Sequence, residues 1–367
     1  MPVAQRAVRV VHLIHGLGLG GLEQLVVELS VRGRSRGVES SIVAFGDEGP
    51  VRELAEQQGI AVERLDAPGL SLAVLGGIGA SLHRRGADVL HAHDLGPWLN
   101  AVAARALRPS TRVMATFHEQ RVPAGKKRHA AAVAARLSSA LVACGDQVRD
   151  EIRAWAPRST QVPVIGNGVT LPAPASASER AALRRELGLA ESDLVIGYIG
   201  GLRQIKGPDK LLAAFLDRFR GMPRVHLVLI GTGPMEAALR AQAAAAPNVH
   251  LPGLIVGASR LLPAFDLYAQ PSLSEGRSLS MLDAMAAGLP TVAHDLPPVA
   301  EIHARGESAL LVPLLDARAL GDALERLASD ESLRARMGKA ARARSLGYSI
   351  EGTADAYAAL YREIARA

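Results

Sequence analysis

The sequence predicts an α/β fold of two Rossmann-like domains, each a doubly wound parallel sheet covered by helices. Three observations support this prediction. Short runs of Val, Ile, Leu and Ala alternate with helical segments along the chain, as expected when both faces of a parallel sheet are buried. The alternation breaks once, near residue 171, and then restarts. The length of 367 residues suits two domains of ordinary size.

The first domain is predicted over residues 1–170, and it opens with a strand over 8–15. A glycine-rich turn then leads into a helix over 21–33. The later elements are near-continuous apolar runs read as strands, each followed by a polar or helical segment. These strands are predicted over 40–45, 87–93, 112–118, 140–145 and 161–169.

Residues 171–180, rich in Pro, Ala and Ser, are predicted to be a linker that runs into a helix start. The second domain follows over 171–347, with strands predicted over 194–202, 225–231, 248–253, 266–272, 290–295 and 309–313. From residue 317 to the end the pattern is helical throughout. Two such domains joined by a short linker form a cleft, and ligands bind beyond the carboxyl ends of the strands.

The composition excludes several classes of function. Aromatic residues make up only 3% of the chain, too few for a base-stacking platform, so we expect no nucleic-acid partner. The single cysteine, Cys144, allows neither an internal disulfide nor a cysteine metal site, and it suits a reducing cytoplasm. The apolar run at the N-terminus is short and ends at Gly16, so we interpret it as a strand and not as a signal peptide. No segment approaches the ~20 apolar residues of a membrane span.

The net charge of +6 is concentrated in the first half, where residues 1–170 hold 20 basic and 15 acidic side chains. Part of the excess forms a run of Arg121, Lys126, Lys127 and Arg128. One interpretation is attraction to an anionic membrane surface or a phosphate-bearing acceptor. The other is a solvated basic face without a partner. The sequence leaves both open.

Three glycine-containing segments lie between a predicted strand and a predicted helix. The first contains Gly16, Gly18 and Gly21 and satisfies G-x-G-x-x-G, which on its own is a weak signal. A dinucleotide site also needs an acid at the end of the second strand. Glu39 precedes that strand and Asp47 lies beyond it, so NAD binding is disfavoured, and a tight turn or an anion cradle remains.

The other two segments carry charged side chains. Residues 200–207 offer Arg203 and Lys206 beside a helix N-terminus, where cationic charge and helix dipole add to bind a diphosphate. Residues 274–279 place Glu275 before a helix start, and Asp283 follows about two turns later on that helix. A carboxylate there can bind sugar hydroxyls while the helix amides bind phosphate oxygens.

These motifs resemble the large family 4 of retaining glycosyltransferases with the GT-B fold. Residues 275–288 resemble its signature E-G-x-x-L-x-x-x-E-A-x-A-x-G, and residues 20–23, 165–169, 206–207 and 230–234 resemble its G-G-x-E, I-P-N-G-V, K-G and I-G-x-G-P motifs in the same order. The resemblance covers nearly the whole chain. It implies an N-terminal acceptor-binding domain, a C-terminal domain for the nucleotide sugar, and a last helix, about 348–367, that returns to the first domain.

The resemblance also implies a set of site residues. The residue that matches Lys206 binds donor phosphates, Glu275 contacts the donor sugar, Asp283 contacts the ribose, and His118 faces the sugar across the cleft. We predict His118, Lys206 and Glu275 as catalytic residues. We predict as donor-binding residues Gly20, Gly21, Gly201, Arg203, Lys206, Gly233, Leu254, Glu275, Gly276, Arg277, Ser278, Leu279 and Asp283.

Two positions depart from the family pattern. Gly201 stands where the family has arginine, and Arg203 is a candidate replacement. Asp283 stands where the family has glutamate, one methylene longer. Both changes bear on donor identity and catalytic efficiency.

We predict no metal site. His91 and His93 have the spacing of a metal pair but lack a third ligand in the sequence, and we interpret them as residues that hold loops beside the cleft. The chain contains no Asp-x-Asp, the motif that binds a metal-held diphosphate in the other major glycosyltransferase fold.

The resulting hypothesis is transfer of a hexose-type sugar, with retention, from a UDP- or GDP-linked donor and without a cofactor. The acceptor is a carbohydrate, a lipid-linked molecule or a small molecule, and acceptor specificity is assigned to loops over 70–79 and 119–129. Polysaccharide or glycolipid synthesis in the cytoplasm, with peripheral contact to the membrane, is the expected setting. Alternatives are a catalytically weak nucleotide-sugar-binding subunit, an epimerase or hydrolase of the same fold, and a dinucleotide-dependent oxidoreductase.

Overall fold

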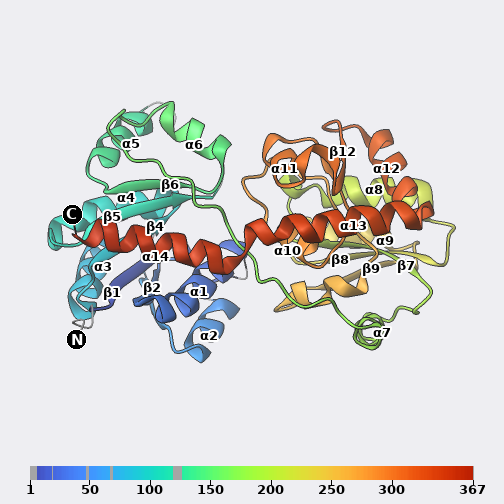
Figure 1. Cartoon of the computed structure of the whole chain (residues 1–367), viewed down its shortest axis with the longest axis horizontal. Coiled ribbons are helices and arrows are strands. Elements are labelled where there is room, and N and C mark those ends of the chain that lie inside the picture. The colour runs from blue at the N-terminus through green and yellow to red at the C-terminus, as the bar shows by residue number, and fades with distance from the viewer. Residues whose placement is uncertain (1–5, 19, 47–48, 67–68, 119–125, 367) are drawn as a thin grey trace. The chain divides into compact units, whose positions relative to one another are not determined.

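The chain forms two compact units, seen in a computed structural model that describes residues 6–18, 20–46, 49–66, 69–118 and 126–366 (Figure 1). Unit 1 consists of residues 1–168 and 350–367, and unit 2 of residues 169–349. The C-terminal helix α14 (Ile350–Arg366) therefore belongs with the N-terminal strands, and it packs against α1, β1 and β4.

Unit 1 is built on a parallel sheet with the strand order β3-β2-β1-β4-β5-β6. The sheet grows outward from β1, with β2 and β3 added on one side of it and β4 to β6 on the other. Because the crossover connections are right-handed, the helices of the two halves cover opposite faces of the sheet. Accordingly α1 contacts α2 and α14, while α4 contacts α3 and α5. The strands are β1 (Val8–Ile14), β2 (Val38–Ala44), β3 (Ala61–Arg64), β4 (Val89–His93), β5 (Arg112–Phe117) and β6 (Ala140–Ala143). The other helices are α1 (Gly21–Gly33), α2 (Pro50–Gln57), α3 (Leu72–Arg85), α4 (Leu95–Ala104), α5 (Lys126–Arg136) and α6 (Asp146–Arg153).

Unit 2 repeats this topology, with the strand order β12-β11-β10-β7-β8-β9. Its strands are β7 (Leu194–Ile199), β8 (Val225–Ile230), β9 (Val249–Gly253), β10 (Leu267–Gln270), β11 (Thr291–His294) and β12 (Ala309–Val312). Its helices are α7 (Ala177–Glu186), α8 (Pro208–Phe219), α9 (Glu236–Ala243), α10 (Leu279–Ala286), α11 (Pro297–Ile302), α12 (Ala317–Ser329) and α13 (Glu331–Ser345). Short 3₁₀ turns occur at 34–36, 105–107, 204–206, 258–264, 304–306 and 346–348.

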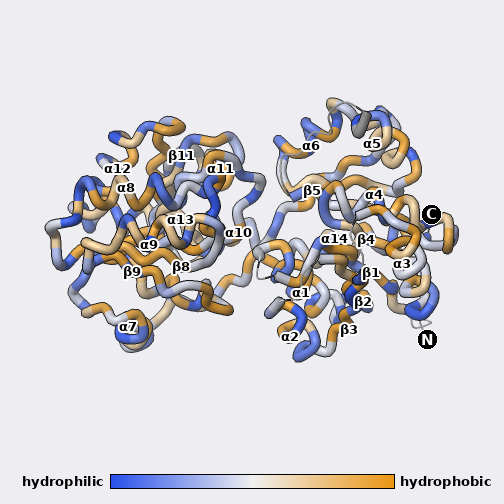
Figure 2. The backbone as a smooth tube through the Cα atoms, turned by 180° about the vertical axis from the view of Figure 1, so that it is seen from behind, coloured by the Kyte–Doolittle hydropathy of each residue, from blue (hydrophilic) through white to orange (hydrophobic). Residues whose placement is uncertain are grey.

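Both sheets are buried on their two faces, as the apolar strand patterns predict. Hydrophobic residues concentrate in the central strands of each unit, and hydrophilic ones in the outer turns (Figure 2). Four of the six residues of β8, the last four, are buried, and so are all five of β4. The predicted α/β class and the two doubly wound sheets are therefore confirmed.

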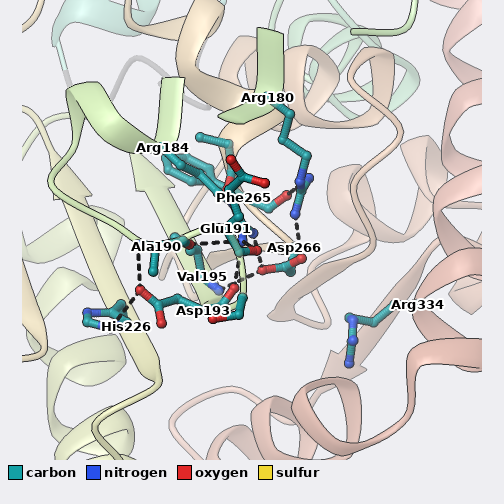
Figure 3. A network of polar contacts seen from close by, with 12 residues as sticks. Arg180, Arg184, Ala190, Glu191, Asp193, Val195, His226, Phe265, Asp266 and Arg334 are labelled. Atoms are coloured by element: carbon teal, nitrogen blue, oxygen red, sulfur yellow. Dashed lines mark hydrogen bonds and ion pairs between the residues drawn. The ribbon is translucent and has the colours of Figure 1, made fainter. Parts of the chain in front are cut away.

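A partly buried ion-pair network fixes α7 to the sheet of unit 2 (Figure 3). Arg180 and Arg184, one turn apart on α7, each donate to a different oxygen of Asp266, at 2.6 and 2.7 Å. Asp266 precedes β10 and also accepts from the amide of Val195 in β7 at 2.7 Å. The network thus lies at the amino ends of β7 and β10, opposite the edge where ligands bind such sheets.

The predicted helical tail after residue 317 is confirmed and consists of three helices. Asp330 caps α13 through the amide of Leu333 (2.8 Å), and a 3₁₀ turn over 346–348 separates α13 from α14. One predicted loop differs from the structure. Residues 70–79, predicted as a loop, mostly belong to α3, which Ser71 caps through the amide of Val74. The three glycines of this stretch have low helix propensity, which is why the sequence did not predict a helix here.

The basic run falls only partly among the residues that the structure describes. Arg121 lies outside the described residues, as does the segment 119–125 of the predicted acceptor loop. Lys126 and Lys127 begin α5, and the exposed Arg128 donates to the carbonyl of Ala154 at 2.9 Å. Among the described residues, no helix is long and apolar enough to cross a membrane.

Candidate functional site

The loops that follow β7, β8 and β10 lie together at the carboxyl edge of the sheet of unit 2. Their neighbouring positions follow from the strand order, in which β7 lies between β10 and β8. The amide of Leu202 donates to the carbonyl of Thr232 at 2.9 Å, and the amide of Leu273 donates to the carbonyl of Ile205 at 2.8 Å. Backbone hydrogen bonds therefore hold the three loops in fixed relation to one another.

Glycines allow this close approach. Gly207 has φ +68°, and a Cβ there would lie 2.0 Å from the carbonyl oxygen of Pro271. Gly231 has φ +144°, and its Cβ would lie 2.0 Å from the carbonyl oxygen of Gly200. At Gly233 the corresponding distance is 2.5 Å, to the carbonyl of Leu202. No other residue fits at these positions without moving backbone.

Lys206 and Glu275 form an ion pair at the centre of these loops. The Nζ of Lys206 lies 3.0 and 2.9 Å from the two carboxylate oxygens of Glu275. Glu275 is 5% exposed, and its Oε1 also accepts from Nε2 of Gln270 (2.7 Å) and Oγ of Ser272 (2.6 Å). A buried carboxylate with three donors is held in one position, whereas the lysine, 30% exposed, keeps access to solvent.

The start of α10 adds an anion-binding element beside Glu275. Ser278 caps the helix through the amide of Met281. The amides that begin a helix have no partner within it and carry the positive end of its dipole. Arg277 directs its side chain to Glu301 (2.6 Å) and over the ring of Tyr348, so a ligand at this helix start meets its backbone rather than its guanidinium.

The remaining predicted donor residues lie around the same edge. Gly201 and Arg203 belong to the loop after β7, and the exposed Arg203 side chain passes beside Gly201. Leu254 follows β9 and is 46% exposed, next to Gly253, whose carbonyl accepts from the amide of Gly231. Asp283 lies half-buried on α10. A hollow of about 600 Å³ between β12 and α12 includes none of these residues.

In unit 1 the predicted residues lie in two places. Gly20 and Gly21 stand where β1 runs into α1, and Gly20 is the N-cap. His118 follows β5, and its amide donates to Asp94 Oδ1 at 2.9 Å. Its Nε2 lies 3.1 Å from Nδ1 of His93, and its Nδ1 lies 3.2 Å from Oδ1 of Asn167.

The sequence did not assign Asp94 or Asn167 to the site. Asp94 directly follows β4 and has φ +66°, a conformation that costs energy in a residue other than glycine and is frequent at functional sites. Asn167 is 5% exposed and lies in the segment that resembles I-P-N-G-V. The available signal for Asp94 was its position directly after a strand. Asn167 lies in the segment predicted as a strand over 161–169, which forms only isolated bridges at Val164 and Val169.

A cluster of buried histidines lies in the sheet of unit 1. His12, His91 and His93 are almost fully buried, and one nitrogen of each falls within 4.8 Å of the others, close enough to hold a metal ion. The sequence pattern revealed no third ligand beside His91 and His93, but the structure supplies one in His12, which pairs with His91 across β1 and β4. His91 and His93 lie inside β4 and are not loop residues, which corrects the sequence interpretation.

Each ring nitrogen of these three histidines already has a hydrogen-bond partner. His12 contacts His93 (3.1 Å) and Ser40 (3.3 Å), and His93 contacts His118 as well. His91 contacts Tyr361 and Thr116, each at 2.7 Å. Burial lowers the pKa of His12 to about 3, and burial with repulsion from neighbouring histidines holds the pKa values of His91 and His93 well below their ordinary value.

Comparison with known proteins relates both units to one family. The model of glycosyltransferase family 4 matches residues 19–171, and the model of glycosyl transferases group 1 matches residues 193–330. The chain belongs to family 4 of the glycosyltransferases. The residues that resemble family 4 motifs at 206–207, 230–234 and 275–288 lie in the loops after β7, β8 and β10 and at the start of α10.

Individual relatives of this family 4 chain are moderately similar. A D-inositol 3-phosphate glycosyltransferase of Corynebacterium urealyticum is 32% identical over 59% of the chain and 55% of the relative. One from Saccharomonospora viridis is 30% identical over 76% of the chain and 65% of the relative. The matches thus span less than two thirds of these relatives.

Solved structures share the fold. The Anabaena protein HepE, solved with UDP and glucose, superposes with a TM-score of 0.84 at 20% identity, covering 97% of this chain and 100% of that one. A sucrose-phosphate synthase from Thermosynechococcus elongatus superposes with a TM-score of 0.78 at 20% identity, covering 97% and 98%. The GT-B fold of the family 4 chain is thereby confirmed.

Proposed function

We propose that this protein is a glycosyltransferase that takes a hexose from a nucleoside-diphosphate sugar held by unit 2. The observation that carries the proposal is the Lys206–Glu275 pair beside the start of α10. A cation, a buried carboxylate and a helix N-terminus on one sheet edge match a diphosphate and the hydroxyls of its sugar. The loop glycines bring backbone amides to the same ligand.

UDP-glucose or a related UDP-hexose is the donor we propose. HepE, which shares the fold, has been solved with UDP-glucose as well as with UDP and glucose. In this chain, Leu254 offers an exposed apolar side chain for the base, and Asp283 a carboxylate for the ribose hydroxyls. A GDP-linked donor is the competing outcome of the nucleotide panel below.

Lys206 and Glu275 are proposed to exchange partners when the donor binds. The diphosphate takes the ammonium of Lys206, and Glu275, which stays buried, accepts hydrogen bonds from sugar hydroxyls instead. The bond between the anomeric carbon and the diphosphate then breaks as the acceptor oxygen bonds to that carbon from the same face. The acceptor proton passes to the leaving phosphate, so the configuration is retained without a protein nucleophile.

Charge on the leaving diphosphate is proposed to be stabilised by Lys206, Arg203 and the first amides of α10, without a metal ion. Arg203 forms no ion pair with any described residue, so it is available for this role. Removal of one such positive group typically costs about 100-fold in rate. Full activity in a chelator tests the metal-independent step.

For unit 1 we propose acceptor binding, with His118 as a hydrogen-bond partner of a substrate hydroxyl. Two relatives are D-inositol 3-phosphate glycosyltransferases, which favours a phosphate-bearing acceptor near the basic run that begins α5. A role in polysaccharide or glycolipid synthesis at an anionic membrane surface, in the cytoplasm, is the wider setting we propose.

The first experiment is a thermal-shift panel with UDP, GDP, ADP, CMP, dTDP and NAD, because a ligand of the folded state raises the unfolding midpoint. We expect UDP to give the largest shift, Lys206→Ala to abolish it, and Lys339→Ala, which removes an exposed lysine on α13, to retain it. The anomeric configuration of the product made from the matching UDP-sugar, read by NMR, tests retention. Tight UDP binding with no transfer to phosphorylated or simple sugar acceptors would contradict the enzyme and favour a binding subunit.

A further inference from the structure

A chain of hydrogen bonds runs through the sheet of unit 1 and ends at His118. It links Ser40 on β2, His12 on β1, His93 on β4, His118 after β5, and Asn167, with successive distances of 3.3, 3.1, 3.1 and 3.2 Å. Each of the three histidines uses both ring nitrogens in this chain. The rings of His12 and His93, and of His93 and His118, are stacked, with their planes 23° and 24° apart.

The chemistry of neutral imidazole makes this chain directional. A neutral ring has one N–H donor and one bare nitrogen acceptor. The carboxamide oxygen of Asn167 accepts only, so Nδ1 of His118 must carry the proton and its Nε2 must accept from Nδ1 of His93. The same rule then makes Nε2 of His93 accept from Nδ1 of His12, whose Nε2 accepts from the hydroxyl of Ser40.

The environment keeps the rings of His12 and His93 neutral. Burial lowers the pKa of His12 to about 3, and burial and nearby histidines hold the pKa of His93 well below its usual value. A proton added to Nε2 of His93 or of His118 would also leave two N–H donors facing each other along the chain. At neutral pH the choice of tautomer at one end therefore propagates to the other.

We propose that His93 and His12 are positioning residues that hold His118 as its Nδ1–H tautomer. This inference rests on the proposed function for its consequence, because a substrate hydroxyl that shares the Nδ1–H of His118 with Oδ1 of Asn167 can then only accept a hydrogen bond. His91 stands outside the chain, since its two nitrogens contact Tyr361 and Thr116. It packs against His93 with ring centroids 4.2 Å apart and so braces the central ring.

A metal ion on His12, His91 and His93 is the competing interpretation, and the contacts disfavour it. A ligating nitrogen must give up its hydrogen bond, and all six nitrogens have one. The cavity beside His12 and Ser40 measures only about 10 Å³, about the space of one water.

The tautomers of the full-length chain can be measured by NMR that correlates ring protons with both imidazole nitrogens, independently of any activity. We expect His12, His93 and His118 all to show a protonated Nδ1. In Asn167→Leu, which removes the terminal acceptor, all three should lose the single tautomer, including His12, three hydrogen bonds away. Thr116→Val, which removes a partner of His91 and of Tyr357 but of none of the three chain histidines, is the matched control and should leave the three unchanged.

Activity provides the second measurement. His93→Gln keeps one donor and one acceptor in the chain, whereas His93→Leu keeps neither. We expect His93→Leu to lower kcat roughly tenfold, the loss of about one hydrogen bond in the transition state, and His93→Gln to restore most of it with KM unchanged. A change confined to His118 in Asn167→Leu would overturn the chain, as would Zn²⁺ that raises the midpoint of unfolding and shifts the signals of His12 and His91. Intact tautomer coupling in a protein without transferase activity would refute the proposed function alone.

Discussion

The two partners of the Lys206–Glu275 pair differ in exposure, and this difference predicts unequal effects on stability. The side chain of Glu275 is 3% exposed and that of Lys206 is 30% exposed. Lys206→Met leaves a carboxylate that cannot reach water. Glu275→Gln leaves an ammonium that can turn to solvent. We therefore expect the lysine substitution to destabilise unit 2 more.

The magnitudes follow from the burial of the charge left behind. Removal of one partner of a fully buried pair costs about 3–5 kcal/mol. Because Lys206 is nearly a third exposed, water screens part of its attraction to Glu275, and we expect about 2–3 kcal/mol for Lys206→Met. Glu275→Gln leaves no buried charge, so its cost should be that of one ordinary hydrogen bond, about 1 kcal/mol.

Urea unfolding can assign these losses to one unit. Both tryptophans, Trp98 and Trp155, belong to unit 1, so their fluorescence follows that unit, whereas circular dichroism follows the whole chain. We expect Lys206→Met to shift the dichroism transition and to leave the fluorescence transition in place.

Lys210 supplies a matched control. It is 29% exposed, like Lys206, but its partner Asp209 is 30% exposed, so Lys210→Met leaves no buried charge and should cost under about 0.5 kcal/mol. Equal losses for Lys206→Met and Glu275→Gln, or a loss in Lys210→Met as large as that in Lys206→Met, would refute the reasoning.

Three further predictions follow from other parts of the structure. The buried histidines of unit 1, represented by His12 with a folded pKa of about 3, bind protons more readily in the unfolded chain. The free energy of unfolding is therefore highest above pH 6.5 and should decrease by roughly 1–2 kcal/mol per histidine when the pH is lowered to 5.5. Tryptophan fluorescence in urea measures this change. Gly207→Ala should lower the free energy of unfolding by more than about 3 kcal/mol and abolish the thermal shift with UDP, because the new Cβ would collide with a backbone carbonyl. Gly188→Ala, at a similar φ of +72° but with open space around the new Cβ, should lower it by only about 1–2 kcal/mol. Arg184→Met should destabilise unit 2 by about 2–3 kcal/mol, because it removes the buried guanidinium that bonds the carbonyls of Glu191 and Asp193, although Arg180 still pairs with Asp266. Arg185→Met, at an exposed position one residue along, should stay within about 0.5 kcal/mol. Similar midpoints for the two variants would contradict the structural role of the network.

The fold was predictable because its signals are local. Each strand is a short apolar run, and alternation with helices leaves few topologies once crossovers are right-handed. Residues 70–79 were misassigned because glycine weakens a helix signal, yet the helix packs closely here: a Cβ at Gly77 would lie 2.6 Å from the end of the Leu65 side chain, which would have to move. Tertiary packing thus decided what propensity did not.

The residues of the candidate donor site could likewise be predicted from the sequence, since its motifs are contiguous and follow strands. The prediction that those residues bind a donor remains to be tested. The chain of hydrogen-bonded histidines could not be predicted, because its members come from separate strands, and in the sequence His12 is only a polar residue inside an apolar run. Their proximity is set by the pairing of β1 with β4 and of β4 with β5, which a single sequence does not display.

The position of α14 bears on how the chain is made. Unit 2 is one continuous stretch, 169–349, whereas unit 1 is completed by residues 350–367, which follow unit 2 in the chain. Tyr361, which contacts the buried His91, is therefore synthesised only after the whole of unit 2. During synthesis unit 2 can therefore fold while the sheet of unit 1 still exposes the face that α14 covers, and premature termination near residue 349 would yield a sound second unit joined to an aggregation-prone first one.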